Sequence, residues 1–107
     1  LPDSPLYILK IIRDNVSGFF ISSPVKKAEY DIDMADVRMS AALVLADNKK
    51  DIPLAKTTIS EAQKYLEKAM MNIRIAKSQG IDIQILLKRF NQAKAKYQEV
   101  ASHIKLI

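Results

Sequence analysis

The sequence of 107 residues contains no cysteine, only two glycines and four prolines, and a single histidine. Without cysteine, the chain cannot form disulfide bonds, thiolate nucleophiles, cysteine-ligated zinc sites or iron–sulfur clusters. A di-iron bundle is also excluded, because it needs Glu-x-x-His pairs on two helices and the chain has only His103. We interpret His103 as a half-exposed residue near a helix end, since a catalytic or metal-binding role would need partners that the neighbouring sequence lacks.

Active-site motifs and long apolar runs are absent from the sequence as well. No glycine-rich phosphate loop, Gly-x-Ser-x-Gly elbow or His-Glu-x-x-His motif occurs, so we expect no enzymatic activity and no cofactor. No run of 18 apolar residues occurs, so we expect no membrane-spanning segment within these residues. Because the chain begins with Leu1 rather than methionine, we expect a fragment or a mature form, and contact with a membrane only through an anchor outside it.

What the sequence does contain favours helices. Apolar residues make up 49% of the chain, which is enough for a substantial core, and the scarcity of glycine and proline is typical of long helices. The length fits a single helical domain over residues 1–107. Four helices are predicted, at about residues 4–20, 24–47, 52–79 and 82–105.

Capping residues mark the predicted helix ends. Ser23, Asp51 and Asp82 are predicted N-caps, and the first two are followed by a proline in the first helical turn. Asn48 is expected to end the second helix in the left-handed conformation. Connections of two to five residues make neighbouring helices antiparallel.

Three of the predicted helices carry apolar rows at alternating steps of three and four, the seven-residue period of supercoiled packing. The rows are Val25, Ala28, Ile32, Ala35, Met39, Ala42 and Ala46; Ala55, Ile59, Ala62, Leu66, Ala69, Ile73 and Ala76; and Ile83, Leu86, Phe90, Ala93, Tyr97, Val100 and Ile104. Alanine recurs every seven residues in the first two rows, which lets two backbones approach closely. We predict an all-α fold: a tight alanine-lined hairpin, a third helix in its groove, and a short N-terminal helix packed on this elongated antiparallel three-helix bundle.

The predicted helix at 4–20 is apolar on nearly every side. Its polar side chains form one narrow stripe: Lys10, Arg13, Asp14 and Ser17. Because such a helix is not stable alone in water, we expect it to pack across the bundle with this stripe toward solvent. Alternatively, part of it is an exposed patch for a partner, a second copy of the chain or a membrane surface. The residues that we expect to contact a partner are these apolar ones and three basic ones of the last predicted helix: Tyr7, Ile11, Phe19, Phe20, Lys88, Arg89 and Lys96.

The net charge of +5 is unevenly distributed. Residues 1–48 carry five basic and seven acidic side chains, whereas residues 49–107 carry twelve basic and five acidic ones. We interpret this asymmetry as mutual neutralisation between neighbouring helices. The alternative is that the last two helices bind nucleic acid or another anionic polymer, or a partner, through a basic flank that includes Lys88, Arg89 and Lys96.

Two further groups of side chains suggest metal binding. Glu29, Asp33 and Asp36 form a carboxylate row on one helix face, which could hold Ca²⁺ or another hard cation. We interpret the row instead as a solvated acidic face that pairs with basic residues of the neighbouring helices. The four methionines could suggest a soft-metal site, but we interpret them as core filler because no cysteine or nearby histidine supports such a site.

The first 46 residues resemble an uncharacterised bacterial domain family. The resemblance is carried by LPDSPLY at the start, by SPVKKAEY after the first predicted helix, and by Ala35, Arg38 and Ala42 in an Ala-x-x-Arg-x-x-x-Ala core. This chain has Ser23 where the family often has an acidic residue. The resemblance implies a helical domain of unknown function that lies outside the cytoplasmic membrane, with no established activity.

These observations lead to one main expectation about function and two alternatives. We expect a non-enzymatic extracytoplasmic helical module that acts as a scaffold, sensor or protein-interaction domain of a larger secreted or membrane-anchored protein. Its partner is expected to be a protein, with a second copy of the chain as a further candidate and nucleic acid not expected. The alternatives are an anionic-polymer binder and a cation-binding bundle.

Overall fold

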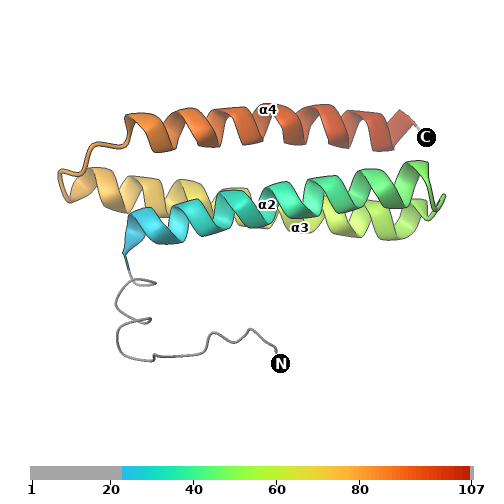
Figure 1. Cartoon of the computed structure of the whole chain (residues 1–107), viewed down its shortest axis with the longest axis horizontal. Helices are drawn as coiled ribbons and strands as arrows, with labels where there is room; N and C mark the ends of the chain where they lie inside the picture. The colour runs from blue at the N-terminus through green and yellow to red at the C-terminus, as the bar shows by residue number, and fades with distance from the viewer. Residues whose placement is uncertain (1–22, 107) are drawn as a thin grey trace, which may run out of the picture.

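The computed structural model describes residues 23–106, which form three helices and contain no strand (Figure 1). The helices are α2 (Pro24–Asp47), α3 (Ile52–Ser78) and α4 (Gln84–Leu106). The all-α prediction is therefore confirmed for this part of the chain. The helix predicted at 4–20 lies outside the described residues.

The helix starts follow the predicted caps with one correction. The Ser23 hydroxyl accepts a hydrogen bond from the backbone N–H of Lys26 (3.5 Å), and the Asp51 carboxylate accepts one from Leu54 (3.2 Å). The helix predicted from about 82 with Asp82 as its N-cap begins at Gln84, so the cap prediction is wrong by one residue. Asp82 accepts the N–H of Gln84 (3.0 Å), and the Ile83 carbonyl accepts the N–H of Leu87 (2.7 Å), so that Ile83 stands at the cap position.

The helix ends differ from each other. Asn48 keeps a right-handed backbone (φ −93°), and the left-handed residue of this connection is Lys50 (φ 58°), so the prediction for Asn48 is wrong. At the end of α3, Gly80 has a φ of 80°. The N–H of Ile81 donates to the Ala76 carbonyl (3.1 Å) and that of Gly80 donates to the Lys77 carbonyl (3.0 Å), which is the Schellman arrangement that ends a helix at glycine.

The core follows the predicted seven-residue rows. The row alanines of α2 and α3 are all fully buried: Ala28, Ala35, Ala42, Ala46, Ala55, Ala62, Ala69 and Ala76. Of the three helix pairs, α2 and α3 share the most extensive contact, as expected where small side chains recur along both rows. The larger buried side chains of α4, such as Phe90 and Ile104, pack into the core that this hairpin provides.

The chain reverses direction at each connection, so that α2, α3 and α4 lie lengthwise beside one another (Figure 1). The two connections lie at opposite ends of this assembly. Within the described part of the chain, no helix has the length and apolar character needed to cross a membrane.

Two buried polar residues do not belong to the predicted rows. Thr58 lies in α3, and its hydroxyl donates to the Leu54 carbonyl one turn earlier (2.8 Å), so the buried group is satisfied within its own helix. Asp31 lies in α2 and accepts a hydrogen bond from the Asn72 amide of α3 (3.3 Å). Asp31 is therefore a polar contact between the two closely packed helices.

Candidate functional site

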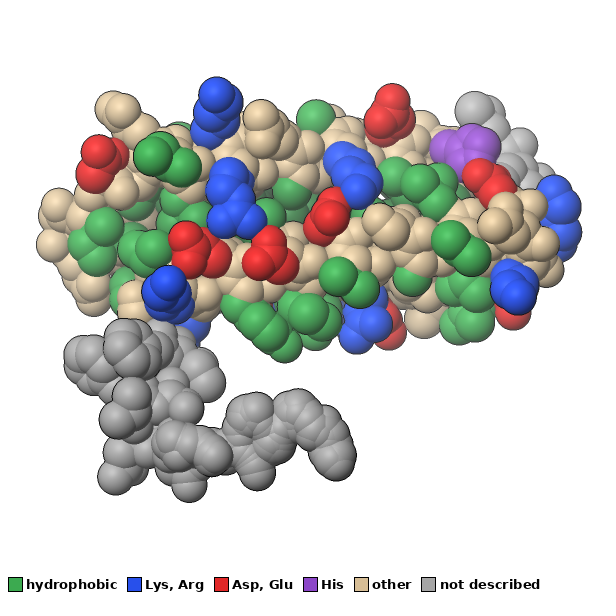
Figure 2. Space-filling model, in the orientation of Figure 1, with side chains coloured by type: hydrophobic (Ala, Val, Ile, Leu, Met, Phe, Trp, Pro, Cys, Tyr) green, Lys and Arg blue, Asp and Glu red, His purple; other side chains and the backbone are tan. Residues whose placement is uncertain are grey.

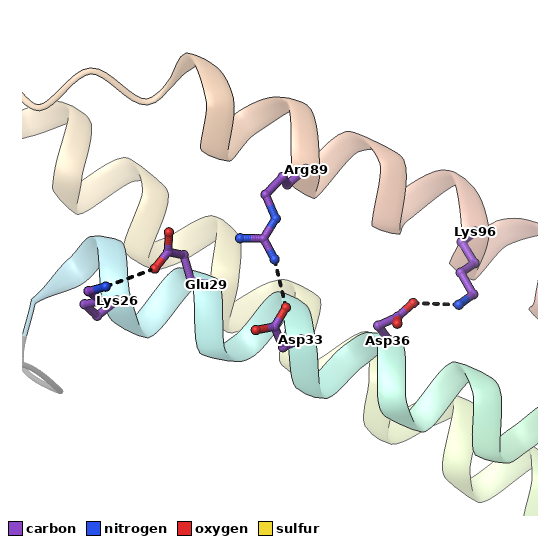
Figure 3. A network of polar contacts seen from close by, with 6 residues as sticks. All are labelled: Lys26, Glu29, Asp33, Asp36, Arg89 and Lys96. Carbon is purple, nitrogen blue, oxygen red and sulfur yellow. Dashed lines mark hydrogen bonds and ion pairs between the residues drawn. The ribbon is translucent and has the colours of Figure 1, made fainter.

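Each carboxylate of the predicted row in α2 lies beside a basic side chain (Figure 3). Arg89 of α4 donates to Asp33 (2.8 Å), and Lys96 of α4 pairs with Asp36 (2.6 Å). Glu29 instead pairs with Lys26 of its own helix (3.8 Å). The prediction that the row pairs with basic residues of a neighbouring helix is thus confirmed for the two aspartates and wrong for Glu29.

The third contact of this kind lies at the far end of α4. The His103 ring nitrogen Nε2 is 2.8 Å from a carboxylate oxygen of Asp47, the last residue of α2. This partner was not predicted, although the spacing contained a signal for it. Arg89, Lys96 and His103 recur every seven residues beside the apolar row, where supercoiled helices place their interhelical ion pairs.

No cluster of three or more carboxylate, histidine or cysteine side chains within residues 23–106 is arranged to hold a metal ion. The methionines differ among themselves. Met39 is fully buried in the core, whereas the Met71 side chain is 63% exposed on α3. The interpretation of the methionines as core filler is therefore wrong for Met71, which lies outside the seven-residue row of its helix.

The basic flank predicted for partner binding is partly occupied by these ion pairs. Arg89 and Lys96 contact α2, while Lys88 is exposed on α4. Arg74 of α3 and Lys94 of α4 line a hollow between those two helices. The other predicted contact residues, Tyr7, Ile11, Phe19 and Phe20, lie outside the described residues.

A hollow lies between α2 and α3, near the start of α2. It has a volume of about 690 Å³. Its lining side chains come from α2 and α3 alone: Lys26, Lys27, Tyr30, Asp31, Lys68, Met71 and Asn72. Two of them are large exposed hydrophobic residues, Tyr30 (59%) and Met71 (63%). We call this region the α2–α3 hollow.

The α2–α3 hollow lies on the side of the hairpin away from α4. The α2 aspartates that pair with α4 side chains are Asp33, Asp36 and Asp47, whereas Asp31 accepts a hydrogen bond from Asn72 of α3. In Figure 2, where α4 forms the upper edge, hydrophobic side chains gather along the lower edge of the molecule, beneath α2. The hairpin therefore has two long sides, one covered by α4 and one that carries exposed apolar groups.

Asp31 gives the α2–α3 hollow its electrostatic character. Burial raises the pKa of this carboxyl above its ordinary value, while the Asn72 amide and the ammonium groups of Lys68 and Lys27 act in the opposite direction. Lys68 also lies over the Tyr65 ring, with 5.3 Å between its ammonium nitrogen and the ring centre. The hollow thus combines apolar surface with one buried carboxyl group and a cationic rim.

The comparisons with known proteins identify a family and no individual relative. No curated protein matches the chain, and no solved structure matches it either. The family model "Domain of unknown function (DUF5667)" matches residues 1–106, which is nearly the whole chain. The protein therefore belongs to the DUF5667 family of domains of unknown function.

Proposed function

We propose that this domain is a non-enzymatic helical module that serves as a scaffold or protein-interaction unit of a larger extracytoplasmic protein. The observation that carries the proposal is a series of contacts between charged side chains of α4 and α2. Arg89, Lys96 and His103 of α4 each contact an aspartate of α2. The contacts are spread along the helix rather than gathered at one point, as suits a stiff body that holds other surfaces apart. The extracytoplasmic setting is supported by the resemblance of the first 46 residues.

We assign two separate regions to partner contact, the outward-facing part of residues 4–20 and the free part of the basic flank. Arg89 and Lys96 are engaged with α2, so Lys88 is the basic residue that we assign to partner contact. Tyr7 and Ile11 border the polar stripe of the predicted N-terminal helix and supply apolar contacts at its edges.

Site-specific photo-crosslinking in the native cell tests this proposal. A photoreactive residue is introduced at position 7 or at position 88 of the full protein, and at exposed Lys49 in the connection between α2 and α3 as a control. We expect a discrete protein adduct from positions 7 and 88 that is absent from position 49. If neither position gives a protein adduct, the protein-interaction proposal is wrong.

A second candidate function is the binding of an anionic polymer, and the hollow between α3 and α4 favours it. Arg74 and Lys94 line this hollow and form no ion pair with any other residue in the range 23–106. Binding of this kind weakens steeply with salt. A mobility assay at low salt, with single-stranded RNA and heparin as probes, should show a shift that Arg74→Glu abolishes and Lys49→Glu preserves. The absence of any shift eliminates this candidate.

A further inference from the structure

The α2–α3 hollow lies beside the point where the preceding chain enters α2. Pro24 is the first residue of α2, and Lys26 and Lys27 of the same turn line the hollow. The residues before Ser23 therefore join the described structure at the edge of this hollow. A side chain four residues before Ser23 can reach about 13 Å from it along an extended backbone.

The side of the hairpin that carries the hollow leaves apolar surface in contact with water. Tyr30 and Met71 are both more than half exposed, and they line the hollow together with buried Asp31. Covering such side chains is worth about 25 cal/mol per Å² of apolar surface removed from water. The opposite side of the same hairpin is already covered by α4, whose Phe90 and Val100 lie in the core.

Residues 4–20 have the apolar composition needed to cover this side of the hairpin. They contain three charged side chains, Lys10, Arg13 and Asp14, all within the polar stripe. At 3.6 residues per turn, the residues opposite the stripe are Ile8, Ile12 and Phe19. A helix over these residues is about 25 Å long, shorter than α2 at about 36 Å, so it fits along the hairpin.

We propose that the α2–α3 hollow and the hairpin side around it are the docking site of this chain's own residues 4–20, with Phe19 inserted between Tyr30 and Met71. The occupant is the chain itself rather than a second copy, because a segment joined to α2 through residues 21–23 is held at an effective concentration in the millimolar range. This proposal goes beyond the proposed function and does not depend on it. Docking completes a four-helix bundle and leaves Tyr7 and the polar stripe toward solvent.

The absence of cysteine provides a direct test in the full chain. Met71→Cys and Ile85→Cys each introduce one thiol at a side chain that the described residues leave well exposed, 63% and 79% respectively. The rate of reaction with a maleimide reagent then reports whether anything covers each position. We expect the thiol at position 71 to react at least about tenfold more slowly than the thiol at position 85, since labelling of a covered site requires local opening.

Two further variants identify the occupant. Ile12→Asp with Phe19→Asp, added to the Met71→Cys chain, should raise the labelling rate at position 71 to that measured at position 85. Ser17→Asp in the polar stripe is the matched control and should leave the thiol at position 71 protected. Circular dichroism of each variant checks that α2, α3 and α4 remain folded, and labelling of the Ile85→Cys chain provides the reference rate.

The outcomes separate the possibilities. Protection of position 71 that stays constant over about a hundredfold range of protein concentration and is lost in the double aspartate variant supports the proposal. Protection that disappears on dilution assigns the site to a second copy and overturns it. Equal labelling at positions 71 and 85 in the two single-cysteine chains also overturns it, whatever the crosslinking test of partner contact shows.

Discussion

Asp33 and Arg89 are separated by 56 positions in the sequence, yet their side chains meet at 2.8 Å across the boundary between α2 and α4. Lys96 and Asp36 repeat this relationship one heptad further along α4. Both aspartates are more than half exposed, so each pair is screened by water and salt. Their main effect is to select the orientation of α4 on the hairpin rather than to add much stability.

A charge reversal tests this role. Asp33→Arg places two cations in contact and should lower the free energy of unfolding by about 0.5–1 kcal/mol. Adding Arg89→Asp restores opposite charges and should recover most of the loss. Urea denaturation at low and high salt measures both effects, and the recovery should shrink with salt. A double variant that is no more stable than the sum of the single changes predicts would contradict the pairing.

The alanine row predicts a strong size limit between α2 and α3. Ala62 is fully buried at this contact, so Ala62→Leu should push the helices apart and destabilise the fold by about 1–3 kcal/mol. The same substitution at exposed Ala95 is the matched control and should change stability by less than about 0.5 kcal/mol. Thermal and urea unfolding measure the difference. Equal effects at the two positions would show that the hairpin is not closely packed.

The buried carboxyl of Asp31 predicts the direction in which the stability of the fold changes with pH. Its pKa is raised in the folded chain by burial, so the folded state holds the proton more tightly than the unfolded state does. This carboxyl therefore opposes folding above its folded pKa and no longer does so below its ordinary, unfolded value. Asp31→Asn should raise stability at neutral pH, with the gain vanishing as the pH falls below the ordinary pKa of an aspartate, about 3.9.

The control for Asp31 is the exposed aspartate two residues later. Asp33→Asn removes an ion-paired carboxylate rather than a buried one, so it should not stabilise the fold at neutral pH. Urea midpoints of both variants between about pH 3 and pH 8 provide the measurement. A loss of stability in Asp31→Asn at neutral pH would mean that the lysines around the hollow outweigh the burial of the carboxylate.

The two left-handed residues predict opposite results. Gly80 has a φ of 80° with open space around the position of a Cβ atom, so Gly80→Ala should cost about 1–2 kcal/mol through backbone strain alone. Lys50 has a φ of 58°, so Lys50→Gly should relieve strain and stabilise the fold by up to about 1 kcal/mol. Thermal unfolding that shifts in the same direction for both variants would be inconsistent with this backbone geometry.

The sequence was sufficient to predict the core because one physical signal determined it. Burial follows the seven-residue rows, and Ala35, Ala62 and Phe90 lie where the spacing places them. Helix starts at Ser23 and Asp51 were predictable as well, since their side chains act on the backbone three residues away. Asp82 misled the prediction because it bonds only two residues ahead, so that α4 begins later.

The site was less predictable because it depends on how the helices are set against each other. Asp31 and Asn72 are 41 positions apart and lie outside the rows, so no local pattern connects them. The exposure of Met71 likewise follows from the position of α4 on the other side of the hairpin, which the composition of α3 does not specify. Only the heptad spacing of Arg89, Lys96 and His103 offered a local signal.

The contacts between the three helices differ in extent, which implies an order in which the helices separate. The α2–α3 contact is the most extensive of the three and contains fully buried alanines, whereas α4 shares a smaller contact with each of the other helices and keeps Ile83 and Tyr97 only partly covered. Amide hydrogen exchange should therefore be fastest in α4 and slowest at the centre of the hairpin. A pulling force applied to the last residues of the chain should detach α4 first, before α2 and α3 separate from each other.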